Sequence, residues 1–208
     1  MEELIKTIES LKKSKIKNLV DYRIQEFKKI SKKSNNEIFN ELCFCIITAN
    51  FNAERGIKIQ NEMKEDFCYL SKNKLAKKLK NLGYRFPNTR AEYVAESRKH
   101  KNSLKNVIDY FENENELREW LVKNIKGIGY KEASHFLRNI GYTNFAIIDF
   151  HIIDILTKYK LIERPKTLTK RKYLEIEYIL KNLAKKLNLN LAELDLYLWY
   201  TETGKILK

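Results

Sequence analysis

The sequence predicts an all-α protein, and three observations support that fold class. Apolar residues recur at spacings of three and four along nearly the whole chain, which is the pattern of amphipathic helices. No run of useful length alternates with a period of two. The 208 residues include only 6 Gly and 2 Pro, too few for the turns of a β-sandwich or barrel. At about 10–14 residues per helix, we expect roughly ten helices.

Each predicted helix is marked by its own apolar stripe. The segment 39–47 is apolar around most of its girth, so we expect it to be central and buried. Gly83 and Gly141 follow two of the stripes, as expected of glycines that end helices. In chain order, the stripes fall at 4–11, 39–47, 75–82, 90–99, 104–111, 117–121, 133–140, 152–159, 174–187 and 194–200.

Length and charge narrow the function. A chain of 208 residues makes one large domain or two small ones sharing a cleft. Its 41 Lys and Arg against 27 Asp and Glu give a net charge of +14, which favours a polyanionic partner, nucleic acid ahead of a membrane surface. The longest apolar run, 42–47, is too short to cross a bilayer, and the N-terminus has no apolar leader. We therefore expect a cytoplasmic protein that does not bind membranes.

Three cysteines, Cys43, Cys45 and Cys68, give no metal or disulfide pattern. The first two lie in the apolar segment 39–47, and no fourth ligand is indicated by spacing. We expect all three to be small buried hydrophobic residues and predict no metal site.

A Gly-Ile-Gly triplet at 127–129 separates two apolar helical stripes, 117–121 and 133–140. We interpret it as a hairpin in which the two glycines permit positive φ and close approach of the backbone to a partner. Ile128 is then the apolar plug between the helices. The N–H groups that open the second helix form an anion site suited to a phosphodiester. An ordinary turn between helices could have the same composition, so the triplet alone does not establish the function.

Two further residues distinguish this hairpin from an ordinary turn. Lys131 lies just inside the second helix, and Asp149 opens the next helix eighteen residues later. With the charge of +14, this arrangement resembles the helix-hairpin-helix-Gly/Pro-Asp superfamily of base-excision DNA glycosylases, in which a lysine in the motif marks the bifunctional glycosylase/lyase branch. The chain is similar nearly end to end to the archaeal 8-oxoguanine DNA glycosylase/AP lyases of the second Ogg type. The segments that carry this similarity are 42–51, 82–86, 126–139, 194–200 and 203–208.

The resemblance implies a catalytic pair, Lys131 and Asp149. The neutral Lys131 amine would attack the sugar at C1′, form a Schiff base and permit β-elimination. Asp149 would stabilise positive charge developing on the sugar and help to activate Lys131. It is also well placed to cap the helix beginning at Phe150, and the two roles are compatible. A solvated lysine and a capping aspartate are the commoner roles of such residues, and only the motif favours catalysis.

The target base must leave the duplex to reach Lys131. The resemblance implies that Phe86 and Trp199 are aromatic walls around the flipped base, and that Asn50 fills the gap and reads the opposite base. The carboxylate of the C-terminal residue, Lys208, would place an acceptor against N7, which carries a hydrogen in 8-oxoguanine and none in guanine. Local patterns alone would assign the two aromatics to core packing and Asn50 to a helix C-cap.

The DNA backbone would be held by Lys126, Gly127 and Gly129. Two departures from the family pattern affect such contacts: Phe150 stands where a basic residue is common, and Lys126 stands where the superfamily often has proline. The iron–sulfur cluster of the endonuclease III branch cannot form, because no cysteine follows Cys68. No cofactor is expected, since the lysine supplies the chemistry.

By the same resemblance, one helical domain spans 25–139 and includes the hairpin, and a second combines 1–24 with 140–208. Lys131 and Asp149 would face each other across an active-site cleft between these domains. The expected partner is double-stranded DNA containing 8-oxoguanine or abasic sites, bound by a monomer in the cytoplasm of a prokaryote, at the nucleoid. Two alternatives stay open: a glycosylase for oxidised pyrimidines or mismatches, and a non-catalytic helix-hairpin-helix DNA-binding module.

Overall fold

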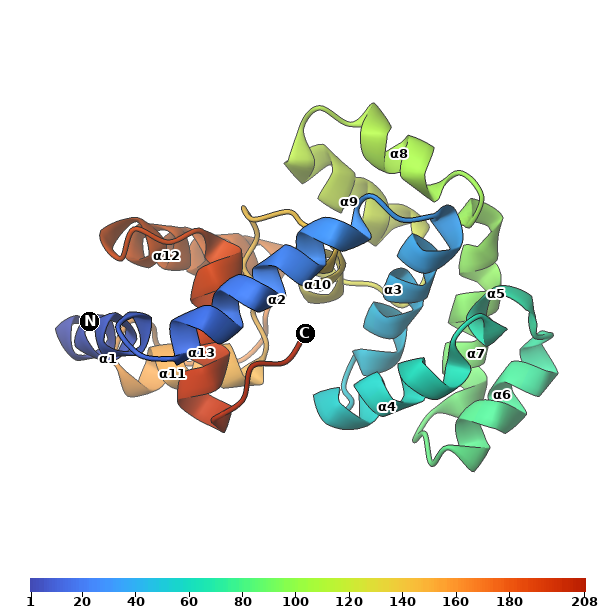
Figure 1. Cartoon of the computed structure of the whole chain (residues 1–208), viewed down its shortest axis with the longest axis horizontal. Coiled ribbons are helices and arrows are strands. Elements are labelled where there is room, and N and C mark those ends of the chain that lie inside the picture. Colours follow the sequence, from blue (N-terminus) through green and yellow to red (C-terminus); the bar gives the residue numbers. More distant parts are fainter. The chain divides into compact units, whose positions relative to one another are not determined.

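The computed structural model describes all 208 residues, which form helices and no strands (Figure 1). The all-α class is confirmed, although 13 α-helices and one 3-10 helix exceed the predicted ten. The helices are α1 (Glu2–Lys12), α2 (Ile16–Ile30), α3 (Asn35–Thr48), α4 (Ala53–Met63), α5 (Asp66–Tyr69), α6 (Lys72–Asn81), α7 (Pro87–Ser97), η1 (Arg98–His100), α8 (Leu104–Tyr110), α9 (Glu114–Asn124), α10 (Tyr130–Asn139), α11 (Phe150–Lys158), α12 (Lys170–Lys186) and α13 (Leu191–Thr203).

Three of these helices were not predicted: α2, α4 and α5. The buried face of α4 includes Gly56 and Gln60, so its apolar stripe is interrupted. The buried residues of α2 lie about one turn apart and form a stripe only one residue wide. Helix α5 is a single turn of four residues, too short to show a periodicity.

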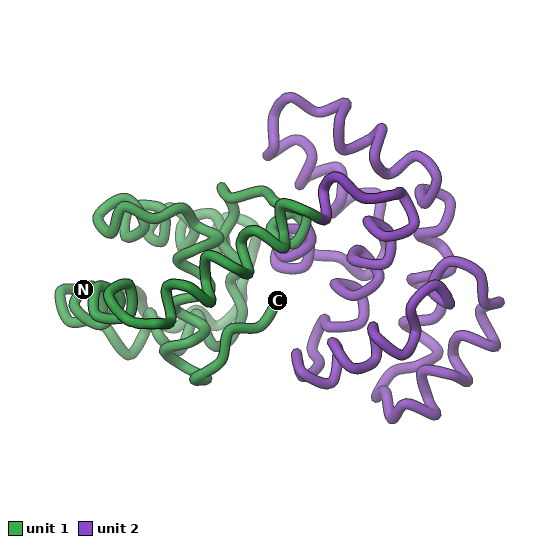
Figure 2. Tube along the Cα trace, in the orientation of Figure 1, with its two compact units in different colours: residues 1–29, 137–208 green, residues 30–136 purple.

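The chain forms two compact units, shown in separate colours in Figure 2. Unit 1 comprises residues 1–29 and 137–208, and unit 2 comprises residues 30–136. Helix α10 begins in unit 2 and ends in unit 1. The predicted division into one helical domain at 25–139 and a second at 1–24 with 140–208 stays a prediction.

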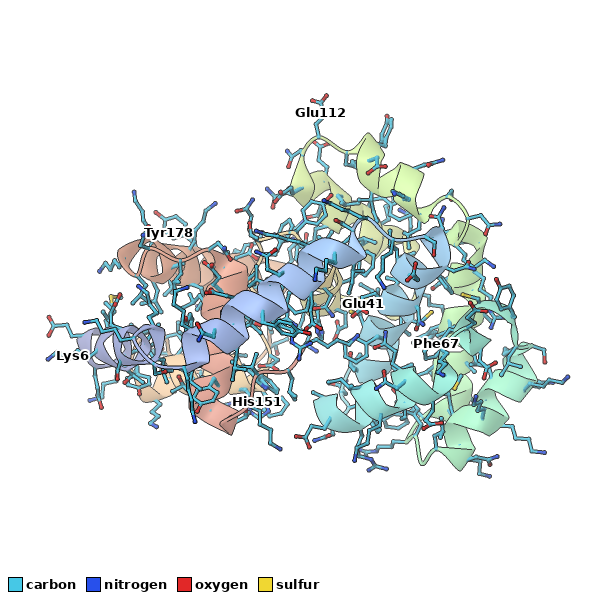
Figure 3. All side chains as sticks on the ribbon, viewed as in Figure 1. Lys6, Glu41, Phe67, Glu112, His151 and Tyr178 are labelled. Carbon is cyan, nitrogen blue, oxygen red and sulfur yellow. The ribbon has the colours of Figure 1, made fainter.

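Unit 2 is built around α3. Nearly every side chain from Ile38 to Thr48 is buried, which confirms the central position predicted for this segment. Helices α4, α5, α7 and α8 pack on it. Cys43, Cys45 and Cys68 are all buried, as expected of small hydrophobic residues, and Figure 3 labels Phe67, the buried neighbour of Cys68 in α5. No group of three His, Cys, Asp or Glu side chains comes together that could hold a metal ion.

Unit 1 is built around α13, which is buried on most sides and packs against α1, α11 and α12. Its core contains a charged pair: the Arg138 guanidinium donates to the Asp195 carboxylate and lies over the Phe27 ring. Both charged side chains are buried, so each compensates the desolvation of the other. None of the helices in either unit combines the length and apolarity needed to cross a membrane.

Candidate active site

The predicted hairpin joins α9 to α10. Gly127 has a φ of +84°, and a Cβ at this position would lie 2.2 Å from Cδ2 of Tyr93 in α7. Both the backbone conformation and the lack of space therefore require glycine. Gly129 does not adopt a positive φ, so only the first of the two glycines uses that freedom. Ile128 is 6% exposed, which confirms its role as an apolar plug.

The start of α10 already attracts a carboxylate. Oε2 of Glu132 accepts a hydrogen bond from the backbone N–H of Gly129 at 3.2 Å, as in half of a capping box. The partial positive charge of a helix N-terminus favours this contact. One of the N–H donors predicted to bind a DNA phosphate is thus engaged by the protein itself.

Lys126 is tied to the protein by two glutamates. Its Nζ donates to Oε1 of Glu92 at 2.6 Å and to Oε1 of Glu96 at 2.9 Å, both in α7. These hydrogen bonds raise the pKa of Lys126 above its ordinary value, and the bond to Glu92 has the larger effect. They stabilise the hairpin entry against α7 in the place where the superfamily often has proline. The phosphate contact of Lys126 stays a prediction.

Lys131 lies in the first turn of α10, with its side chain 22% exposed. The nearest acidic atom to its Nζ is Oε1 of Glu132, at 3.8 Å, beyond hydrogen-bond distance. The amine therefore makes no hydrogen bond within the protein, although its side chain is partly buried. In its deprotonated form, such an amine can react with a bound electrophile.

Asp149 is the N-cap of α11, as predicted. Its Oδ1 accepts a hydrogen bond from the backbone N–H of Ile152 at 3.0 Å, and its backbone is extended. The other carboxylate oxygen, Oδ2, has no hydrogen-bond or ion-pair partner. The cap thus fixes the orientation of the carboxylate while one oxygen remains available to offset positive charge on a substrate.

Aromatic side chains meet between α11 and α13 in unit 1. The His151 ring contacts the Trp199 indole edge to face, with centroids 4.8 Å apart and an interplanar angle of 82°. The Phe150 ring, 63% exposed, lies 4.0 Å from that of His151, which Figure 3 labels. Nε1 of Trp199 is buried without a hydrogen-bond partner.

The C-terminal tail leaves α13 at Gly204, which has a φ of +69° and ends the helix in the left-handed conformation. Figure 1 shows the tail turning back from the end of α13. Lys208, the last residue, is partly buried. Its contact with a base stays a prediction.

Two predicted base-reading residues lie at loop positions in unit 2. Asn50 is exposed, with a φ of +56°, and follows Ala49, the C-cap of α3. A hydrogen bond from α7 fixes the backbone just before Asn50: Nη2 of Arg90 donates to the Ala49 carbonyl at 2.9 Å. Phe86 is 43% exposed, immediately before the first residue of α7, and the Arg85 guanidinium lies 4.9 Å from its ring centroid.

The predicted site residues divide between the two units. Unit 2 contains Asn50, Phe86, Lys126, Gly127, Gly129 and Lys131, and unit 1 contains Asp149, Trp199 and Lys208. Sequence reasoning missed the groups that support them. Glu132 could have been found, since it stands at the third helical position after Gly129. The glutamates that bind Lys126 lie about thirty residues before it in the chain, and no local pattern indicates them.

Comparison with known proteins gives close full-length matches. Residues 20–189 match the family described as 8-oxoguanine DNA glycosylase. The 8-oxoguanine DNA glycosylase/AP lyase of Methanocaldococcus jannaschii is 58% identical over 99% of both chains, and that of Korarchaeum cryptofilum is 48% identical over 100% of this chain and 99% of the other. The crystal structure of the M. jannaschii glycosylase/lyase in complex with a 15mer DNA containing 8-oxoguanine covers 99% of this chain and 100% of its own, at 58% identity and a TM-score of 0.97.

Proposed function

Because this chain belongs to the 8-oxoguanine DNA glycosylase family, we propose that it excises 8-oxoguanine from double-stranded DNA and cleaves the backbone at the resulting abasic site. The observation that best supports this activity is the Lys131 side chain, which is partly buried in the first turn after the hairpin and makes no hydrogen bond in the protein. The enzyme would act as a monomer in the cytoplasm of a prokaryote, at the nucleoid.

The reaction would proceed in two stages. Neutral Nζ of Lys131 forms a bond to C1′ of the damaged nucleotide while the bond from C1′ to the base breaks. The base leaves with that electron pair and takes up a proton, and the nitrogen of Lys131 loses one. Opening of the sugar ring gives a Schiff base between Lys131 and C1′. Loss of a proton from C2′ then expels the 3′ phosphate by β-elimination, which cleaves the strand. Hydrolysis of the Schiff base releases Lys131.

In this scheme the Asp149 carboxylate stabilises positive charge on the sugar. The sugar becomes positively charged as the base departs, and a carboxylate near the ring lowers the energy of that state. Oδ2, the oxygen that the helix cap leaves available, is suited to this role. Lys131 and Asp149 would act together on one sugar.

The recognition residues belong to the same proposal. Phe86 and Trp199 would stack on the flipped base, and Asn50 would occupy the gap and hydrogen-bond the orphaned partner. Backbone groups at Gly127 and Gly129 would hold a phosphate next to the lesion, which requires the Glu132 carboxylate to release the Gly129 N–H.

A panel of lesions tests this function against both alternatives. We expect single-turnover excision of 8-oxoguanine to exceed that of oxidised pyrimidines and mismatched bases, measured on otherwise identical duplexes. Preferred excision of a pyrimidine lesion or a mismatched base would favour the first alternative. Tight binding without excision of any base would favour the DNA-binding module.

Removing Lys208 should slow recognition of the lesion without disabling the lyase. The Lys208 carboxylate would accept the N7 hydrogen of 8-oxoguanine, but it would have no hydrogen-bond donor to pair with on guanine. This difference would favour 8-oxoguanine over guanine by roughly tenfold to a hundredfold. We expect the chain ending at Leu207, and a chain extended beyond Lys208, to excise 8-oxoguanine more slowly by that factor. Cleavage of preformed abasic sites, the control, should change little. Equal excision by the truncated and intact chains would rule out the tail as the base reader.

A further inference from the structure

The segment that leads into Asp149 belongs to no helix or strand, yet it is buried. Residues 145–148 are all less than 10% exposed, and the chain contains no β-sheet. Backbone N–H and C=O groups in a buried segment need hydrogen-bond partners. Two side chains of α12 are the partners of three of these groups.

Tyr173 and Glu177 hold this segment by three hydrogen bonds. Oη of Tyr173 donates to the carbonyl of Ala146 at 2.6 Å and accepts from the N–H of Ile148 at 3.3 Å. Oε1 of Glu177 accepts from the N–H of Ala146 at 3.0 Å. The two side chains are four residues apart, one turn along the same face of α12, and Tyr173 is 2% exposed. The backbone is thereby fixed immediately before Asp149.

We propose that Tyr173 and Glu177 are positioning residues for the Asp149 carboxylate, an inference that rests on the proposed catalytic role of Asp149. The hydrogen bond from the Ile152 N–H fixes the Asp149 carboxylate after it in the chain. Helix α12 fixes the backbone before Asp149, at Ala146. Displacing a catalytic group by about 1 Å can reduce a rate by roughly a hundredfold. Both side chains bond to the backbone that leads into Asp149, so we expect them to affect the rate through the placement of Asp149.

Tyr173→Phe tests the proposal, because it removes the hydroxyl and keeps the ring that packs in the core. We expect single-turnover excision of 8-oxoguanine to slow by about tenfold, with an unchanged Kd for the lesion duplex. Tyr178→Phe is the matched control, since Tyr178 lies on the same helix, is 67% exposed and projects outward in Figure 3. A wild-type excision rate in Tyr173→Phe would overturn the proposal.

A double-mutant cycle distinguishes positioning from general destabilisation. If Tyr173 acts through Asp149, Tyr173→Phe should slow excision little further in a chain that already carries Asp149→Asn. A second, independent tenfold loss in that background would contradict positioning. If Asp149→Asn alone leaves excision at the wild-type rate, the proposed role of Asp149 fails. If Asp149→Asn is slow while Tyr173→Phe is not, only the present inference fails.

Glu177 provides a second test that does not depend on the folding of Tyr173→Phe. Glu177→Gln retains a carbonyl oxygen that can accept from Ala146, whereas Glu177→Ala has no acceptor. We expect slower excision in the alanine variant and recovery of most of the rate in the glutamine variant. Equal rates in Glu177→Ala and the wild type would show that this hydrogen bond does not position Asp149.

Discussion

Replacing Lys131 by glutamine is expected to abolish strand cleavage and to lower excision by roughly a thousandfold or more. Glutamine keeps the approximate length and polarity of the side chain but cannot form a Schiff base. Side-chain burial at this position is only partial, so the fold should tolerate the change. The measurement is single-turnover excision and cleavage of a duplex containing one 8-oxoguanine, together with the Kd for the same duplex.

Lys123→Gln is the control for that experiment. Lys123 is an exposed residue in the last turn of α9 and makes no hydrogen bond within the protein. The Lys123→Gln variant should excise and cleave like the wild type. Both substitutions replace a lysine by glutamine, and only the position in the chain differs. Strand cleavage at wild-type rate by Lys131→Gln, with Kd unchanged, would remove Lys131 from the mechanism.

Asp149→Asn should separate catalysis from capping. Asparagine is also a good N-cap residue, so α11 should remain capped and the melting temperature should shift by less than about 2 °C. Loss of the carboxylate removes stabilisation of the positive sugar, and we expect excision to fall by about 10²–10³-fold. The measurements are the melting temperature and the single-turnover rate on the same preparation.

Asp149→Ser extends this comparison, because serine caps a helix and has no carboxylate. It should resemble Asp149→Asn in both measurements. A large fall in melting temperature in both variants would indicate a structural role for Asp149, provided that the loss of excision is no larger than the fraction of unfolded protein.

The parts of the fold that the sequence predicts are those with a local cause. The segment 39–47 is apolar around its girth and is the centre of unit 2. Asp149 stands directly before a helical stripe and caps α11. The family, inferred from the hairpin and the segments around it, is confirmed by the comparisons.

The parts that the sequence does not predict depend on contacts distant in the chain. Arg118 and Arg138 are charged residues that a sequence pattern places at the surface, yet both are buried against groups elsewhere in their unit. Tyr173 stands directly before the predicted stripe 174–187, and only the structure reveals its hydroxyl bonded to Ala146. Periodicity identifies which face of a helix is buried but not which atoms meet it.

The central claim is that the Lys131 amine forms a covalent bond with the sugar of the damaged nucleotide. Borohydride reduction during reaction with a duplex containing 8-oxoguanine, followed by mass-spectrometric mapping of the adduct, tests it most directly. We predict a protein–DNA adduct located on Lys131. No adduct during active strand cleavage, or an adduct located on another residue, would contradict the claim.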